Sequence, residues 1–216
     1  ELGRHEEAIE HINRALVIAQ QVGDVRGRGI WLSNLALVYD DLQQPQRAVE
    51  THTKAVEIAR RLHDQRGLAV RLTNLGNSYV TLGDYAQAIE QFKEVVELQR
   101  TLGDQREVAV RLSIIGNLYN QLGHAQDSTT DATPHFAKAI DYYGQTLTIA
   151  RELDDVITEA QLLRSIGKAL GSMGRFSQAL EYLDAAYEMF DVLGLDDQRN
   201  ETRKTIKLVK RHRVEE

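Results

Sequence analysis

The chain repeats itself with a period of 40 residues, and no other feature of the sequence constrains its fold as strongly. A shift of 40 places Asp24 on Asp64 and Asp104, and it also brings Tyr39 onto Tyr79. A fixed period of roughly 20–50 residues marks architectures in which similar supersecondary units stack on one another. We therefore expect one such unit in each copy of the repeat, with every unit packed on the next.

Between the third and fourth copies the step is 51 residues, so eleven residues are inserted there. The period returns to 40 from Phe136 to Phe176, which confines the insertion to residues 125–135. The segment is polar and contains Pro134, so it predicts a surface loop that ends where Thr133 caps the next helix. Such a loop is either functional, as a partner contact or a phosphorylation site, or tolerated variation, and the sequence leaves both open.

Apolar residues within each copy follow the spacing of amphipathic helices, as Val70, Leu75 and Tyr79 do. Gly83 and Asp84 then interrupt the pattern with a residue suited to a left-handed turn and a helix-capping side chain. Each copy therefore predicts two antiparallel helices. Small residues are expected to let their backbones approach closely, namely Ala36, Gly76, Gly116 and Gly167 on the first helices, opposite Ala48, Ala88, Ala139 and Ala179 on the second.

The second copy carries a recognisable signature, made of Leu75, Gly76, Tyr79, Gly83, Tyr85, Ala88 and Phe92 in this order. It resembles the tetratricopeptide repeat, whose usual length is about 34 residues. The 40-residue form is similar to the repeats of the Pins/LGN polarity adaptors and of bacterial signalling proteins. Pro45, His52 and Leu170 depart from the signature. The resemblance implies an all-α fold, an α-solenoid in which antiparallel helix pairs form a right-handed superhelix.

The repeats organise the chain as a single solenoid domain over residues 1–216. The expected segments are the second helix of a truncated repeat (1–23), four repeats (24–63, 64–103, 104–154 with its insertion, and 155–194) and a C-terminal capping helix (195–216). The sequence starts within a repeat signature and without Met, so we expect it to be a fragment of a longer protein. The unpaired first helix makes self-association through this end an expectation as well.

Composition excludes several classes of protein. The chain is 42% apolar with a net charge of −6, and it has no apolar run long enough for a membrane span, so we expect an ordered cytoplasmic protein. The acidic balance disfavours a general nucleic-acid binder, although the basic last helix leaves this as a minor alternative. Cys is absent, and the seven His include no pair at the i, i+4 spacing of a zinc site. We therefore expect no enzyme, no metal and no cofactor.

The family resemblance implies that the first helices line a concave groove, which is the candidate binding site. Its expected peptide-binding residues are mostly short and polar, namely Asn34, Leu37, Thr73, Asn74, Asn77, Ser113, Asn117, Gln121, Arg164 and Lys168. Asn side chains both donate and accept, so a ladder of them could pair the backbone of an extended peptide. The alternative is that Asn77 and Asn117 only bond neighbouring repeats.

Arg164 and Lys168 form the one inward cationic pair that the sequence predicts, suited to an acidic partner or simply to solvent. The leading functional hypothesis is a non-catalytic scaffold that binds a peptide or helical segment of another protein, or of another domain of its parent chain. The alternative is a sensor or regulatory arm of a larger signalling ATPase or protease whose catalytic domain lies outside this sequence.

Overall fold

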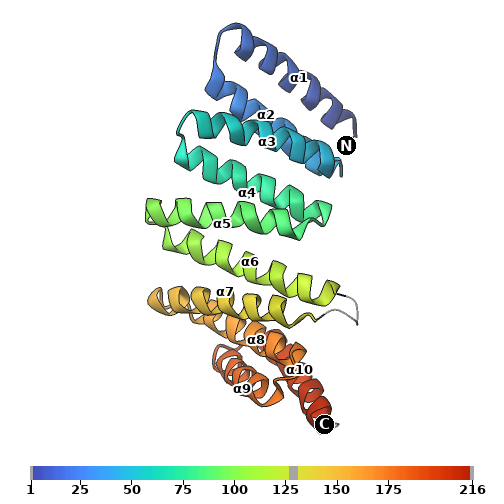
Figure 1. Ribbon diagram of the computed structural model, residues 1–216, viewed down its shortest axis with the longest axis vertical. Coiled ribbons are helices and arrows are strands. Elements are labelled where there is room, and N and C mark those ends of the chain that lie inside the picture. The colour runs from blue at the N-terminus through green and yellow to red at the C-terminus, as the bar shows by residue number, and fades with distance from the viewer. Residues whose placement is uncertain (1, 127–130, 215–216) are drawn as a thin grey trace. The chain divides into compact units, whose positions relative to one another are not determined.

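The computed structural model describes residues 2–126 and 131–214, and every regular element among them is an α-helix (Figure 1). The expected all-α class is confirmed. The helices are α1 (Leu2–Gln21), α2 (Val25–Asp41), α3 (Pro45–Arg61), α4 (Gln65–Leu82), α5 (Tyr85–Leu102), α6 (Gln105–Ala125), α7 (Thr133–Glu152), α8 (Val156–Ser172), α9 (Phe176–Val192) and α10 (Asp196–Val214).

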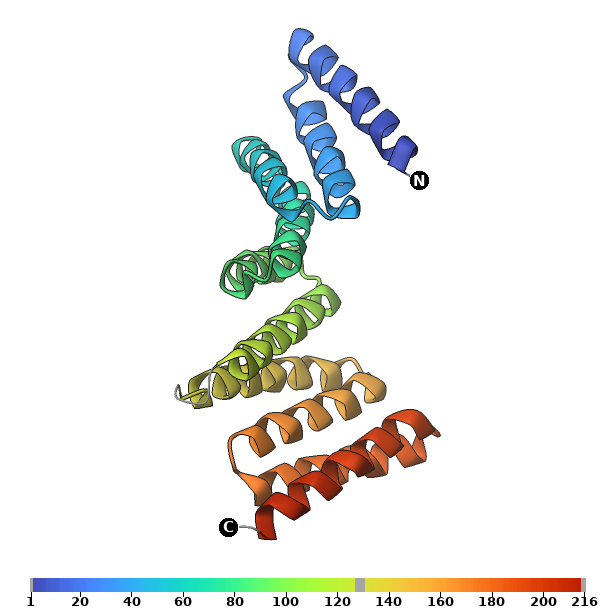
Figure 2. The same ribbon diagram turned by 90° about the vertical axis from the view of Figure 1, so that its right-hand side faces the viewer.

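The helices fall into two compact units, residues 1–103 and residues 104–216, called unit 1 and unit 2 below. In unit 1, the hairpins α2–α3 and α4–α5 pack on each other through α3 and α4, and α1 packs on α2. In unit 2, the hairpins α6–α7 and α8–α9 are joined through α7 and α8, and α10 packs on α9. Figure 2 shows the same succession of hairpins within each unit from the side. The expected consecutive helix pairs are thus present, while a single domain over the whole chain stays a prediction.

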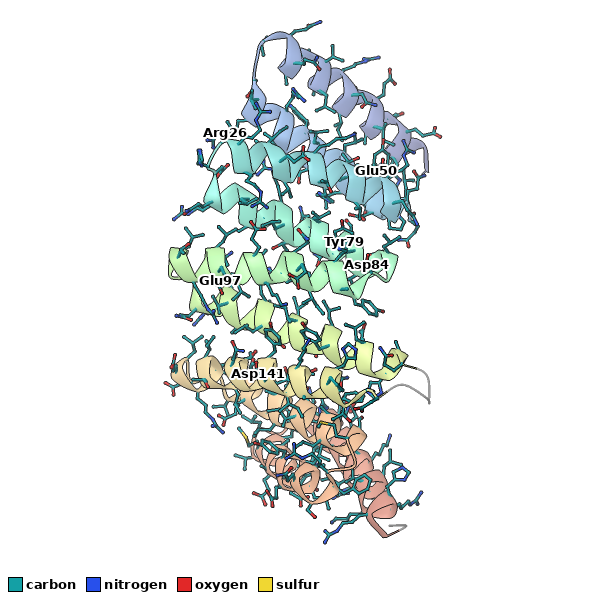
Figure 3. The ribbon with its side chains drawn as sticks, viewed as in Figure 1. Arg26, Glu50, Tyr79, Asp84, Glu97 and Asp141 are labelled. Carbon is teal, nitrogen blue, oxygen red and sulfur yellow. The ribbon has the colours of Figure 1, made fainter. Side chains whose placement is uncertain are left out.

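Aspartates cap the start of five of the ten helices in the described part of the chain. Asp64 Oδ1 accepts a hydrogen bond from the Gly67 backbone N–H at 3.0 Å, and Asp24, Asp84, Asp104 and Asp155 cap α2, α5, α6 and α8 in the same way. Such caps pair N–H groups that have no partner inside the helix. At the end of α4, Gly83 takes the left-handed conformation with φ +82°, which a residue without Cβ adopts at little cost. Figure 3 shows Tyr79 and Asp84 at this turn.

Glycines allow the two helices of a hairpin to approach closely, as expected. A Cβ on Gly76 would lie 2.7 Å from Phe92 Cε1, and one on Gly116 would lie 2.6 Å from Tyr143 Cε1. Aromatic rings, and not the expected alanines, therefore lie over Gly76 and Gly116, whereas a Cβ on Gly167 would lie 3.0 Å from the backbone oxygen of the expected Ala179. Those alanines are fully buried nonetheless, at Ala48, Ala88, Ala139 and Ala179.

The insertion differs from its prediction at both ends. Helix α6 continues to Ala125, so Gly123 is helical and packs on Phe136, although its counterpart Gly174 forms a left-handed turn. The expected cap by Thr133 is wrong: Thr133 donates its backbone N–H to Asp131 Oδ1 at 2.9 Å. Residues 127–130 of the insertion lie outside the described part of the chain.

Candidate functional site

A hollow of about 390 Å³ opens between α2 and α4 in unit 1. Its walls come from the first helices of two successive repeats, and it is called the unit 1 hollow below. The lining residues are Arg26, Ile30, Ser33, Asn34, Leu37, Asp64, Gly67, Val70, Arg71 and Asn74. Three of the predicted site residues, Asn34, Leu37 and Asn74, are thus brought together around one concave surface.

The unit 1 hollow combines exposed apolar side chains with amides and charges. Ile30, Leu37 and Val70 are exposed, although aliphatic side chains of this size are usually buried. Arg26, labelled in Figure 3, extends its Nη1 to within 3.5 Å of Asp64 Oδ2. The hollow therefore offers apolar contact, amide hydrogen bonds and an ion pair within one site, a combination typical of ligand sites.

Two predicted residues of unit 1 lie outside this hollow. Thr73 is half-buried, and Asn77 is exposed on α4. The Asn77 backbone carbonyl accepts a hydrogen bond from Thr81 Oγ1 at 3.2 Å, which is a contact within its own helix. A place for Thr73 and Asn77 in a binding site stays a prediction.

A second hollow, of about 640 Å³, lies among α6, α7 and α8 and is called the unit 2 hollow. Of the predicted site residues it includes Ser113. Its lining residues are Arg106, Ala109, Val110, Ser113, Ile114, Thr146, Ala150, Leu153, Asp155, Thr158 and Gln161.

The two hollows occupy equivalent places in the repeat. Residues 26, 30, 33 and 34 of the unit 1 hollow correspond, two copies later, to residues 106, 110, 113 and 114 of the unit 2 hollow. Residues 64, 67 and 70 likewise correspond to residues 155, 158 and 161. Even the charges are repeated, because Arg106 and Asp155 correspond to Arg26 and Asp64. Hydrogen bonds from Thr158 are the main cause of the lowered pKa of Asp155, and the charge of Arg106 lowers it further. The hollow is thus a property of the repeat and not of one irregular loop.

The side chain of Asn117 forms a hydrogen bond with the neighbouring helix α7. Its Oδ1 accepts a hydrogen bond from the Tyr143 hydroxyl at 2.8 Å. Burial raises the pKa of Tyr143 to about 12, so this hydroxyl remains a donor at neutral pH. Gln121, one turn further along α6, is exposed and lies outside the unit 2 hollow.

Both cations of the predicted pair, Arg164 and Lys168, form ion pairs within unit 2. Arg164 Nη1 and Lys168 Nζ each donate to a carboxylate oxygen of Glu201 in α10, both at 2.8 Å. The hydrogen bond from Lys168, together with the charge of Arg164, lowers the pKa of Glu201 against the opposing effect of its partial burial. The pair therefore holds α10 on α8 in this structure and does not line either hollow.

Apart from Leu37, sequence reasoning missed the apolar residues of the hollows. Ile30, Val70 and Val110 are spaced 40 residues apart and are all exposed. An apolar residue that recurs at the same repeat position could have been read as a second apolar face, separate from the hairpin core. This second apolar face was not predicted, because helical periodicity alone assigns such residues to the core.

The described residues give no sign of metal chemistry or of a membrane span. Residues 2–126 and 131–214 contain no cluster of three His, Asp or Glu side chains placed to hold a metal ion. No helix in that part of the chain has the length and apolar character needed to cross a bilayer.

Comparison with known proteins identifies the repeat. One tetratricopeptide-repeat profile matches residues 1–61 and 136–191, and a second matches residues 71–102. No curated protein matches the chain significantly. The profiles do not distinguish the Pins/LGN-like subgroup, which stays a prediction.

Several solved structures share the fold at low sequence identity. The nearly identical TPR-like repeats described as a kinesin light chain from Podosopora anserina align with a TM-score of 0.68 at 18% identity, over 89% of each chain. The apo form of RapI aligns with a TM-score of 0.69 at 17% identity, over 88% of this chain and 50% of RapI.

A signal transduction ATPase with numerous domains (STAND) from Pyrococcus horikoshii, which has a tetratricopeptide-repeat sensor, aligns with a TM-score of 0.68 at 19% identity. The alignment covers 91% of this chain and 30% of that one. At such identities these likenesses show the fold alone. The profile matches, which together span more than half of the sequence, show that the chain belongs to the tetratricopeptide-repeat family.

Proposed function

We propose that the chain is a non-catalytic interaction scaffold whose first helices bind a peptide or a helical segment of another protein. The observation that carries this proposal is the recurrence of the hollow at the same repeat position in both units. Repeat folds present such concave surfaces to partners, and interaction with other proteins is the general role of this fold.

The chemistry of the unit 1 hollow supports a peptide as its ligand. A bound peptide buries backbone N–H and C=O groups that must be paired, because an unpaired buried group is costly. Asn34 and Asn74 lie on opposite walls and can each donate and accept. Between them, Ile30, Leu37 and Val70 provide apolar surface for a side chain of the peptide.

In each unit the proposed binding residues are those that the sequence predicted, grouped around the hollow of that unit. Asn34, Leu37, Asn74 and Ser113 have direct support because they line a hollow. Thr73, Asn77 and Gln121 would act only if a longer ligand extended beyond the hollows. Asn117, Arg164 and Lys168 would have to exchange an internal partner for the ligand.

A test begins with peptides selected from a synthetic array by the full chain. Asn34→Ala combined with Asn74→Ala should weaken the selected peptides roughly tenfold, as expected for the loss of two neutral hydrogen bonds. Asn200→Ala, a change of the same kind on the exposed surface of α10, is the matched control and should leave affinity unchanged. Thermal unfolding of all variants should stay close to that of the unmodified chain. Failure to select any peptide, or equal affinity for both variants, would contradict the scaffold proposal.

A second candidate is that the same binding face serves as the sensor arm of a larger signalling protein. The alignment with a STAND ATPase that has a tetratricopeptide-repeat sensor favours this role over that of a free adaptor. The sequence of the complete gene tests it directly, since an ATPase or protease domain in the same reading frame would support the sensor arm. A frame that contains tetratricopeptide repeats alone would contradict it.

A further inference from the structure

Arg71 is a buried cation with unused hydrogen-bond donors. It lines the unit 1 hollow from α4, and only 8% of its surface is exposed. Its Nη1 donates to the Gly67 backbone carbonyl at 2.9 Å. Its Nε is buried and finds no acceptor among the described residues. A guanidinium has five N–H donors, so one carbonyl leaves most of its hydrogen-bonding capacity unused.

Gly67 makes room for this guanidinium, which extends towards Gly29 of α2. A Cβ on Gly67 would lie 2.6 Å from Arg71 Nη1, which is closer than real contacts allow. On the opposite wall, a Cβ on Gly29 of α2 would lie 3.6 Å from Arg71 Nη2. The side chain thus reaches across the hollow from α4 towards α2 and presents its charge inside it.

The next repeat shows what Arg71 lacks. Arg111 stands at the same repeat position in α6, and its Nη2 donates to Glu107 Oε2 at 2.9 Å. Gly67 occupies the repeat position of Glu107. Arg111 is therefore paired by a carboxylate of its own helix, whereas the corresponding carboxylate is missing beside Arg71.

The nearby carboxylate of Asp64 does not replace the missing one. Its Oδ1 caps α4 through the Gly67 N–H, and its Oδ2 lies 3.5 Å from Arg26 Nη1. Burial lowers the pKa of Arg71; Asp64 opposes this effect and Arg26 adds to it. The charged groups that line the hollow are Arg26, Arg71 and Asp64, which leaves one uncompensated positive charge.

The unit 2 hollow shows that this cation is not required by the repeat fold. Leu162 stands at the position that corresponds to Arg71, and it is buried. The repeat therefore accepts an apolar residue at this position, and the charge in unit 1 calls for another explanation.

We propose that the unit 1 hollow recognises a carboxylate of its ligand through the guanidinium of Arg71. The carboxylate would come from an Asp or Glu side chain or from a free C-terminus, and the apolar wall beside it would hold a neighbouring aliphatic side chain. A planar guanidinium and a carboxylate can form two parallel charge-assisted hydrogen bonds, which are stronger than neutral ones. This inference rests on the proposed peptide-binding function and specifies its ligand.

The experiment uses two synthetic peptide arrays, one with amidated C-termini and one with free carboxylates, and the full chain as the binding protein. Ligands of the unmodified chain should be enriched in Asp or Glu at one position, or should require the free C-terminus. Replacing that Glu by Gln, or amidating that terminus, should weaken binding about tenfold. The two arrays thereby distinguish a side-chain carboxylate from a terminal one.

Variants of Arg71 assign the effect to this residue. Arg71→Gln should bind the acidic peptide and its neutral counterpart equally. Arg66→Gln, which removes an exposed charge from the same helix outside the hollow, should keep the full preference for the acidic peptide.

A second variant keeps the test valid if Arg71→Gln fails to fold. Gly67→Glu supplies a carboxylate within α4, in the arrangement that Glu107 and Arg111 already adopt in α6. The new Cβ requires the Arg71 guanidinium to shift, and the new carboxylate should then pair it, so the preference for acidic peptides is lost although Arg71 is retained.

The outcomes separate this inference from the function on which it rests. Peptides that depend on Asn34 and Asn74 but show no preference for a carboxylate would overturn the role of Arg71 and leave the scaffold proposal intact. An acidic preference that survives both Arg71→Gln and Gly67→Glu would overturn it as well. Arrays without any bound peptide would contradict both proposals.

Discussion

The imidazole of His52, fully buried in α3, has its Nε2 3.4 Å from Asp40 Oδ2 in α2. The same carboxylate oxygen accepts a hydrogen bond from Ser78 Oγ of α4 at 2.8 Å. Three helices of unit 1 therefore meet at one polar cluster, at the repeat position where the next hairpin buries Phe92. Burial lowers the pKa of His52 from its ordinary value of 6.5, and Asp40 only partly offsets this effect.

The buried His52 predicts that acid destabilises unit 1. Above pH 6.5 the imidazole is neutral in both the folded and the unfolded chain, so its contribution to stability is fully present. Below that pH the unfolded chain binds a proton more readily, and stability falls until the pH passes the lower pKa of the folded state. Denaturant midpoints measured from about pH 7.5 to about pH 5 should fall less for His52→Gln than for the unmodified chain. Denaturant midpoints that fall equally with pH in His52→Gln and in the unmodified chain would contradict the prediction.

Gly76→Ala should destabilise unit 1 by about 1–3 kcal/mol, the usual cost of overpacking a core. Its new Cβ would lie 2.7 Å from the ring of Phe92, which is itself fully buried and cannot retreat. Gly144→Ala is the matched control, because nothing lies within 4 Å of the Cβ that it adds to α7. This control should gain about 0.5–1 kcal/mol from helix propensity. Chemical denaturation should show a lower free energy of unfolding for Gly76→Ala and a higher one for Gly144→Ala than for the unmodified chain.

Asn117→Ala should destabilise unit 2 even when no ligand is present. The variant leaves the buried hydroxyl of Tyr143 without its acceptor, at a cost of about 1–3 kcal/mol. Adding Tyr143→Phe removes that unpaired hydroxyl and should recover most of the loss. A double-mutant cycle in denaturant measures the coupling, and strictly additive effects would show that the contact does not matter for stability.

Glu201→Gln should turn the paired cations of α8 into a binding site for acidic ligands. Arg164 and Lys168 then lose the carboxylate that neutralises them, and binding of a poly-glutamate peptide at low salt should increase. The thermal stability of the chain should change by no more than about 1 kcal/mol, since the Glu201 side chain that changes is 54% exposed. Glu188→Gln removes an equal charge from the exposed surface of α9 and should not increase binding.

The fold could be predicted from the sequence because its determinants are local and repeated. The positions of Asp64 and Asp104 fix helix starts, and Gly83 fixes a turn, through contacts only a few residues away. The start of α7 was mispredicted where the repeat is interrupted, because Asp131 and Thr133 have no counterpart elsewhere in the chain.

The candidate site was predictable only in part, because its chemistry depends on contacts between distant residues. The sequence shows Arg164 and Lys168 as a free cationic pair, but their partner Glu201 lies more than 30 residues further along the chain. Asn117 likewise looks available until Tyr143 is placed beside it. Asn34 and Asn74 do line the unit 1 hollow, because their repeat position faces it, and their role in binding stays a prediction.

The equivalence of positions 71 and 162 has a consequence for how such a protein can acquire new partners. The same repeat position holds a guanidinium at Arg71 in α4 and an aliphatic side chain at Leu162 in α8, while each hairpin packs on its neighbour in the same way. If Arg71 selects the ligand as we propose, exchanging this one residue would change the preferred ligand. On that proposal each hairpin would vary in selectivity independently of the others, and a duplicated repeat would add a binding position with a preference of its own.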